Sequence, residues 1–404
     1  MRAVMMMCAL FVATATARPE QTMSDGDAAF ATALHAQLRA QKGNLFYSPA
    51  SVRVALAMAM AGARGTTQAE LARALSLPSG PEAARIVGAQ LADWDKLAPK
   101  EQAPEAELVV LRVVNRVWAQ PGRKLLDAFV RTLGDLYRAP LGTVDFRQDS
   151  EGARRTINEW VAKATEQRIP ALVGPGQLAS DTKLMVTNAV YFKGRWLSPF
   201  RPQLTSEGPF SVGGGRTVTV PLMHKLNYEW ITRVDGAFVL ERRYAGDRIA
   251  MDIILPNRKD GLGAIEDAYV KGALLGALKD FSYALVQLTL PKFKLSSAME
   301  LLPALERLGV VHATKRGEAD FSGIDGARDF YLGGVIHQAV VGVDEATTEA
   351  AAATVDRLPP TLALNAEPAG PIVFNADHPF FFVIRDTQAG VVLFAGRVVD
   401  PTAR

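Results

Sequence analysis

Residues 335–374 read VIHQAVVGVDEATTEAAAATVDRLPPTLALNAEPAGPIVF. Residues 335–343 alternate between two faces as a half-buried strand does, and both faces carry aliphatic side chains. Asp344–Thr354 then contains no large apolar residue, no glycine and no proline. Four prolines break up the chain after it, before the apolar residues Ile372–Phe374. The pattern predicts a strand that runs directly into a segment of small side chains.

Asp344–Leu358 allows two interpretations. Alanine is the best helix former, acidic residues lie near the start of the segment, and Pro359 would end a helix. Only Val355 and Leu358 could anchor such a helix, whereas a surface helix normally carries a broader apolar stripe. The alternative is a segment that can become a strand later, with these small side chains on one face: Thr348, Ala350, Ala352 and Thr354.

Several stretches of the chain resemble one family, the serpins. The segment after Val343 resembles the hinge of a serpin reactive-centre loop, and NADHPFFFVIRD with VVLFAGRVVDP after it resembles the C-terminal strands. Four more stretches are similar to serpin sequences: Asn44–Leu71 (NLFYSPASVRVALAMAMAGARGTTQAEL), Thr187–Phe200 (TNAVYFKGRWLSPF), Leu290–Leu301 (LPKFKLSSAMEL) and Glu318–Ile324 (EADFSGI). They occur in serpin order, so the resemblance covers most of residues 25–402.

The resemblance implies a single serpin domain over residues 25–402, with the reactive-centre loop at residues 344–371. It implies an α+β fold with three β-sheets and about eight or nine helices. The pattern of helices and strands agrees with this class, because it lacks a βαβ rhythm.

Hydrophobic periodicity predicts the individual elements. The expected helices are Gly26–Arg39, Ser51–Met60, Thr66–Leu75, Glu82–Ala92, Leu125–Tyr137, Ser150–Gln167, Asp260–Leu278 and Ala298–Leu308. The expected strands are Leu108–Trp118, Lys183–Phe192, Arg216–Met223, Tyr228–Thr232, Ala237–Tyr244, Ile249–Leu255 and Ala284–Leu290.

Composition and motifs argue against several function classes. The net charge of +3 over 404 residues is too small to imply nucleic-acid binding, and no Lys/Arg block marks a polyanion site. None of the motifs G-x-S-x-G, H-E-x-x-H, G-x-G-x-x-G or the P-loop occurs. We therefore expect a protein that is not an enzyme and that has no cofactor or metal site.

Residues 1–17 are expected to be a signal peptide. Arg2 supplies the positive start, Ala3–Val12 is an apolar run too short to span a bilayer, and small residues permit cleavage after Ala15 or Ala17. No other run is long enough for a membrane span. The only cysteine, Cys8, lies inside the apolar run, so the mature chain would have no disulfide. We expect a secreted, extracellular protein, or a periplasmic one in a bacterium.

His337 lies between apolar neighbours in the strand, which is typical of a core histidine with satisfied hydrogen bonds. The resemblance places it in the serpin shutter, a polar cluster beneath the central sheet, together with Ser48, Ser51 and Asn188. Such a cluster is stable only when each member is paired, so it is a suitable place for strands to part. A histidine there could make the opening sensitive to pH.

The resemblance also implies a site called the breach, where the loop first meets the sheet. Glu345 and Lys292 match its salt bridge, and Trp196 lies beside them. A surface ion pair contributes about 0–1 kcal/mol, and a partly buried one could contribute more.

The implied mechanism is that of a suicide substrate. A serine protease, or a cysteine protease, cuts the loop and remains covalently attached while the hinge inserts between two parallel strands of the main sheet. The hinge residues are Glu345, Thr347, Thr348, Glu349, Ala350, Ala351, Ala352 and Ala353. The implied inhibitor is a monomer with no membrane or nucleic-acid partner.

The scissile bond has three candidates. Counting from Glu345 as in inhibitory serpins gives Thr361-Leu362, and a longer loop gives Leu362-Ala363 or Leu364-Asn365. All three favour elastase-like, chymotrypsin-like or subtilisin-like proteases, which have small or medium apolar pockets.

Two residues depart from the inhibitory pattern. Thr347 stands where inhibitory members usually have glycine, and Asp356 would point inward after insertion, which is unfavourable for a carboxylate. Pro359 and Pro360 would limit how far insertion runs. These departures leave a second interpretation open, a non-inhibitory serpin that acts as a carrier or chaperone.

Overall fold

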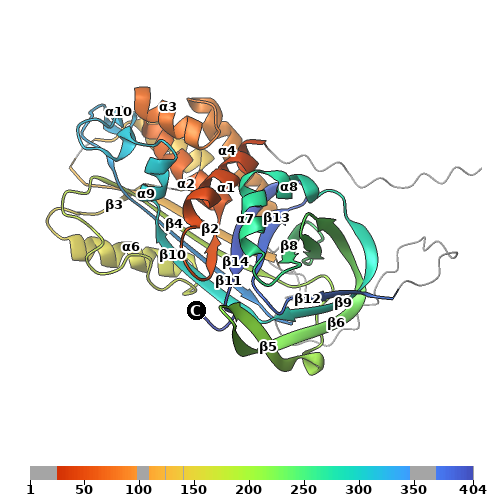
Figure 1. The fold of residues 1–404 in the computed structure, drawn as a ribbon. Coiled ribbons are helices and arrows are strands. Elements are labelled where there is room, and N and C mark those ends of the chain that lie inside the picture. Colours follow the sequence, from red (N-terminus) through yellow and green to blue (C-terminus); the bar gives the residue numbers. More distant parts are fainter. Residues whose placement is uncertain (1–24, 98–108, 123, 140, 346–369, 404) are drawn as a thin grey trace, which may run out of the picture.

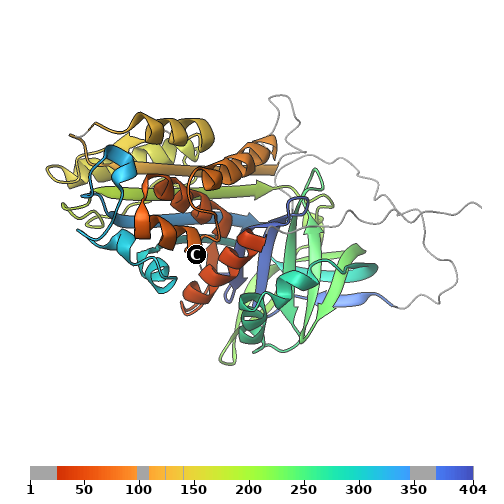
Figure 2. The same ribbon diagram turned by 90° about the horizontal axis from the view of Figure 1, so that it is seen from above.

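The computed structural model describes residues 25–97, 109–122, 124–139, 141–345 and 370–403. The expected signal peptide therefore lies outside the described residues, as does the predicted loop apart from its two ends. Most helices gather at one end of the molecule, and the strands of residues 206–256 lie at the other end (Figure 2).

The described residues contain ten α-helices, close to the eight or nine expected. They are α1 (Asp25–Leu38), α2 (Pro49–Gly62), α3 (Gly65–Ala74), α4 (Pro81–Trp94), α5 (Asp127–Arg131), α6 (Ser150–Ala164), α7 (Leu262–Val270), α8 (Ala273–Ala277), α9 (Leu302–Arg307) and α10 (Ser322–Asp325).

The strands form two hydrogen-bonded sheets. The five-stranded sheet has the order β10-β11-β4-β2-β3, and its strands are β2 (Val109–Ala119), β3 (Gly142–Thr143), β4 (Leu184–Gly194), β10 (Phe293–Glu300) and β11 (Leu332–Val343). The nine-stranded sheet contains β1 (Leu45–Tyr47), β5 (Ser206–Gly213), β6 (Arg216–Val234), β7 (Ala237–Arg243), β8 (Ile249–Pro256), β9 (Ser282–Pro291), β12 (Ile372–Asn375), β13 (Phe380–Asp386) and β14 (Val391–Val398). Mixed helices and sheets confirm the α+β class.

One long strand explains why the described residues form two sheets and not three. The sequence predicted separate strands at Arg216–Met223 and Tyr228–Thr232, but β6 is one strand of 19 residues. Its first part pairs with β5 and its last part with β7, while β9 pairs across the junction between them. Continuous hydrogen bonding along β6 therefore joins two of the expected sheets.

Four predicted helices differ in extent or continuity, and the one expected at Asp260–Leu278 is divided into α7 and α8 at Gly272, whose φ is 75°. The predicted helix Ala298–Leu308 is wrong at its start, because residues 298–300 belong to β10 and pair with β11, and α9 begins only at Leu302. The helix expected to reach Gln167 ends at Ala164, where Glu166 and Gln167 have φ values of 51° and 63°. The helix expected at Leu125–Tyr137 becomes a π-helical turn after Arg131.

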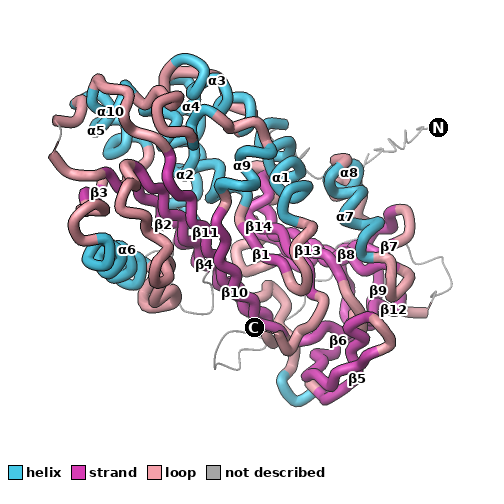
Figure 3. Tube along the Cα trace, turned by 60° about the vertical axis from the view of Figure 1, so that its left-hand side comes forward, coloured by secondary structure: helices cyan, strands magenta, loops and turns pink. Residues whose placement is uncertain are grey.

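The five-stranded sheet is covered on both faces. Helices α1 to α4 lie on one side of its strands and α6 lies on the other (Figures 1 and 3). The alternation predicted for β11 is confirmed, because Val335 and Val341 join the core that includes α2, whereas Ile336 and Val340 pack with α6. A sheet buried on both faces can open only if one of these layers moves.

Asn158 fixes α6 to the chain that follows it. Its Oδ1 accepts hydrogen bonds from the backbone N–H groups of Leu172 and Val173 at 2.9 and 2.8 Å, and its Nδ2 donates to the Val173 carbonyl at 2.9 Å. Asn158 is buried, so water could not replace these hydrogen bonds if its side chain were removed.

The substitution Asn158→Ala should therefore lower the free energy of unfolding by about 3 kcal/mol, because it leaves buried backbone groups unpaired. Urea unfolding measures the loss, and Glu159→Ala, at an exposed position of the same helix, is the matched control. Equal stability of the two variants would contradict the role given to Asn158.

Candidate functional site

The parallel contact between β4 and β11 is the centre of the candidate site. Its register runs from Leu332 opposite Leu184 to Val341 opposite Phe192, and we call this contact the seam. The other long neighbours in the sheet, β10 with β11 and β2 with β4, are antiparallel. Parallel pairing is slightly less stable per residue than antiparallel pairing, so the seam is weaker per residue than either of these two contacts.

A buried polar cluster lies under the seam. It consists of Ser48, Ser51, Asn115, Asn188 and His337, all of them buried. The strands place three members in one row, because His337 pairs with Asn188 and Asn188 pairs with Asn115. Ser51 lies in the first turn of α2, and Ser48, just before the helix, caps it by accepting a hydrogen bond from the Ser51 N–H at 3.1 Å.

The hydrogen bonds of the cluster determine the tautomer of His337. The backbone N–H of Ser48 donates to His337 Nε2 at 3.0 Å, so that nitrogen must be unprotonated. The ring proton therefore lies on Nδ1 and is donated to Asn188 Oδ1 across the seam. The Asn188 amide donates in turn to Ser51 and to Asn115. The ring thus joins β11 to β4 and both strands to α2.

The charge state of His337 follows from its burial. Its side chain is completely shielded from solvent, and burial lowers the pKa of its imidazole to about 3. A proton on Nε2 would also face the N–H of Ser48, so the charged ring could not keep this hydrogen bond. His337 is therefore neutral in the folded protein near neutral pH.

The structure brings the four sequence-predicted residues of the cluster together and adds Asn115. A polar side chain inside the apolar run VVLRVVNRVWA was the only sequence signal for it. That signal does not show which residue lies beside Asn115, because the register of β2 against β4 depends on pairing between distant segments.

A second cluster holds the chain where β11 ends. Glu345 Oε2 lies 2.7 Å from the Lys292 ammonium, and Glu345 Oε1 accepts from the Thr205 hydroxyl at 2.7 Å. Its carbonyl accepts from the Phe200 N–H at 3.0 Å. Burial alone would raise the pKa of Glu345, but the hydrogen bonds from Lys292 and Thr205 hold that pKa below its usual range. The residue is therefore an anchored carboxylate, and Thr205 is a partner that the sequence did not predict.

Trp196 lies beside the cluster around Glu345. Its indole Nε1 donates to the carbonyl of Asp344 at 3.0 Å, and its ring stacks on Tyr244 with centroids 4.4 Å apart. The Arg242 guanidinium lies 5.1 Å from the Trp196 ring centroid. Asp344 and Glu345, where the predicted hinge begins, are thus fixed by backbone and side-chain contacts, so the position from which the hinge leaves the sheet is well defined.

Helix α6 closes the seam from the other face. Met185 and Ala189 of β4 and Ile336 and Val340 of β11 pack in one apolar cluster with α6. Separation of the strands must disturb this cluster as well as the hydrogen bonds below.

The predicted hinge residues Thr347–Ala353 and the predicted reactive bonds between Thr361 and Asn365 lie outside the described residues. The described chain stops at Glu345, beside β4 and β11, and resumes at Gly370, just before β12.

The described residues offer little for hydrolytic chemistry. On the surface of the described part, Ser206 lies 3.1 Å from one ring nitrogen of His224, and the other ring nitrogen meets the Thr289 hydroxyl and not a carboxylate. In the described part of the chain, no group of three or more His, Cys, Asp or Glu residues is arranged to hold a metal ion. None of the helices there combines the length and apolar character needed to cross a membrane.

Comparison with known proteins gives a consistent result. A family model described as "Serpin (serine protease inhibitor)" matches residues 25–401. The leukocyte elastase inhibitor of Equus caballus is 36% identical over 372 residues, which cover 89% of this chain and 93% of the relative. An uncharacterized serpin-like protein of Thermococcus kodakarensis is 37% identical over 371 residues, covering 91% of this chain and 83% of the relative. The structure of Serpin48, a highly specific serpin from the insect Tenebrio molitor, has a TM-score of 0.79 at 29% identity and covers 93% of this chain and 97% of its own.

The neutral buried ring of His337 predicts a pH dependence of stability. The histidine titrates near 6.5 in the unfolded chain and near 3 in the folded one, so between these values the unfolded chain binds more protons. The free energy of unfolding should therefore fall below pH 6.5 by up to about 1.4 kcal/mol per pH unit.

Urea unfolding at pH 6.5 and pH 5.0 tests this. The wild type should lose about 2 kcal/mol more than His337→Gln, which cannot titrate. His35, whose pKa is also lowered by burial, is present in both proteins and cancels in the comparison. His224→Gln, outside the cluster, is the control and should behave as the wild type. An equal loss in wild type and His337→Gln would contradict the assignment.

Proposed function

This chain belongs to the serpin family and is a protease inhibitor, and on that premise we propose that it traps serine endopeptidases by inserting its own cut loop into the seam. The observation that carries the proposal is the parallel pairing of β4 with β11, with Glu345 anchored where β11 ends. A hinge that turns back from this point runs antiparallel to both strands. One parallel contact would be replaced by two antiparallel ones, with a gain of ladder hydrogen bonds.

The covalent step uses the chemistry of the protease. Its serine Oγ attacks the carbonyl carbon of Thr361, or of Leu362 or Leu364 if the loop is cut later. The peptide C–N bond breaks, the amine of the next residue leaves with a proton, and an ester joins the loop to the protease. A cysteine protease would form a thioester in the same way.

Insertion then competes with hydrolysis of this ester. The strands must break the His337–Asn188 hydrogen bond that crosses the seam, and the apolar cluster under α6 must part. Small inward side chains shorten the time for which the seam has to stay open. Alternation places Thr348, Ala350, Ala352 and Thr354 on the inward face, which supports rapid closure over the inserted strand.

The loop sequence supports the choice of target. The residues before the three candidate bonds are Thr361, Leu362 and Leu364, which suit elastase-like, chymotrypsin-like or subtilisin-like proteases. Likeness to a leukocyte elastase inhibitor supports the same class. We also propose that the chain is exported, which rests on the signal-peptide pattern of residues 1–17.

Mixing the protein with an elastase-like or subtilisin-like protease should give a complex that survives SDS and is larger than the inhibitor alone, because the ester is covalent. Electrophoresis detects the complex, and the mass of the released C-terminal peptide identifies the bond. If every such protease cuts the loop and stays active, the carrier or chaperone interpretation, favoured by Thr347 and Asp356, replaces inhibition.

The inward alternation predicts a contrast between two neighbouring positions. Ala350→Glu would bury an unpaired carboxylate during insertion, so the amount of inhibitor consumed per protease trapped should rise at least tenfold, for a cost above about 1.4 kcal/mol. Glu349→Ala, at the neighbouring position whose side chain would face the other way, is the control and should keep the wild-type stoichiometry. Titration of a fixed amount of protease measures both, and equal effects would refute the alternation.

A further inference from the structure

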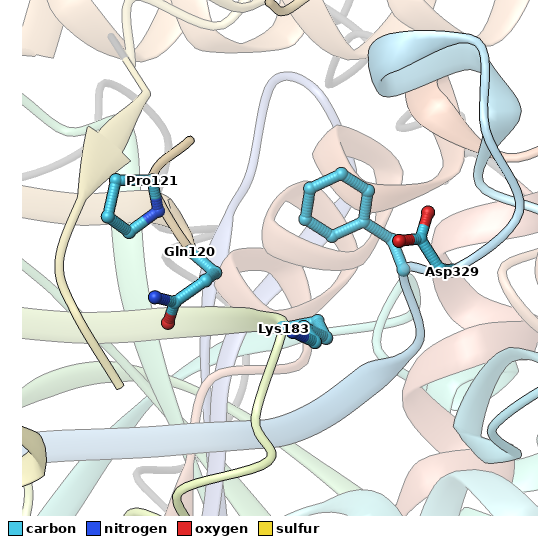
Figure 4. A pocket seen from close by; sticks show the side chains of 5 residues that line it. Gln120, Pro121, Lys183 and Asp329 are labelled. Atoms are coloured by element: carbon cyan, nitrogen blue, oxygen red, sulfur yellow. The ribbon is translucent and has the colours of Figure 1, made fainter. Parts of the chain in front are cut away.

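A small cavity lies at the far end of the seam from Glu345. It has a volume of about 80 Å³ and is lined by Gln120, Pro121, Lys183, Asp329 and Phe330. Lys183 directly precedes β4, Phe330 lies just before β11, and Gln120 follows β2. In Figure 4 the side chains of Gln120 and Pro121 lie on one side, Asp329 on the other, and Lys183 between them. The cavity thus sits where an inserted strand would leave the sheet.

The register of insertion can be counted from β11. If Asp344 and Glu345 form the reversal, residue 346 lies opposite Val343, and each step forward along the hinge is one step back along β11. Residue 359 then lies opposite Phe330, and residue 360 lies opposite Asp329. The bulge at Gly333 shifts this count by no more than about one residue. The end of the inserted segment therefore reaches the cavity, and residues 359 and 360 are both proline.

We propose that this cavity is the seat of Pro359 and Pro360 after the loop is cut, and that their docking fixes where insertion stops. The proposal rests on the loop insertion proposed above.

The chemistry of the cavity fits a pair of prolines. Prolines have no N–H and cannot extend the ladder, but their carbonyl oxygens remain acceptors. The Lys183 ammonium is a pure donor and can meet such a carbonyl. Pro121 is exposed and offers an apolar ring of the kind on which proline-rich segments dock elsewhere, whereas Phe330 is almost completely buried and would add its ring only when the strands part.

The size of the cavity also fits. One water needs roughly 10–15 Å³ by the same measure, so about 80 Å³ exceeds a single water several-fold. Insertion moves β11 away from β4 by about 4.8 Å, one strand spacing, which widens the gap between Phe330 and Lys183. The cavity of the uncut protein thus provides part of the volume that the two prolines need, and the separation of β11 from β4 provides the remainder.

A single fluorophore tests the seat. The full-length chain carries one cysteine, so Cys8→Ser with Arg328→Cys allows an environment-sensitive dye beside the cavity, at an exposed residue that directly precedes Asp329 and does not line the cavity. After a cut at Thr361-Leu362 or later, verified by mass, the emission should shift to shorter wavelength and quenching by iodide should fall. The same dye at Thr217→Cys, in the β5–β6 hairpin, should not respond.

Two controls test whether the shift depends on Pro359 and Pro360. A trypsin-type cut after Arg357 leaves Pro359 and Pro360 on the other fragment, so the hinge can insert without them and no shift is expected. Pro359→Gly with Pro360→Gly, cut at the later bond, should also lose the shift.

A labelled protein that forms the SDS-stable complex but shows no shift after the later cut would overturn the seat and leave inhibition standing. An equal shift in the glycine variant or after the Arg357 cut would also overturn it. Failure to form any complex would refute the proposed function, and the seat with it.

Discussion

The parallel pairing of β4 with β11 is the contact on which the rest of the structure depends. Both strands are buried, with α2 on one side and α6 on the other, yet the ladder between them is the least favourable type in the sheet. An antiparallel segment placed between them would add backbone hydrogen bonds on both of its edges. The uncut fold is therefore expected to be held by a kinetic barrier, and not by the lowest free energy available to the chain.

The layers on the two faces of the seam set that barrier. Below it, the neutral ring of His337 joins Asn188 to the start of α2, and each buried group left unpaired during opening costs about 1–3 kcal/mol. Above it, opening exposes apolar side chains packed under α6. Both costs are transient, because an inserted strand can restore the pairing and the burial. A barrier of this kind keeps the uncut protein in its fold for a long time and still allows fast insertion once the loop is cut.

Resemblance to a family gave more of the site than local pattern did. His337 and Asn188 were assigned together from family-like stretches, and the structure places them in one cross-strand pair. Asn115 was missed, because an isolated polar residue in an apolar strand does not reveal which strand lies opposite. Thr205 was missed for the same reason, since its contact with Glu345 joins segments 140 residues apart. Periodicity predicts where a strand lies, but it does not predict which residues of a distant segment lie opposite it.

The most direct test of this account is the melting temperature of the protein, measured by calorimetry before and after a single cut in the loop. If the freed hinge inserts into the seam, the cut protein should melt more than about 10 °C above the intact one, because a whole strand has been added to the sheet. A cut protein that melts at the same temperature as the intact one, or lower, would show that the seam accepts no strand and would contradict the account.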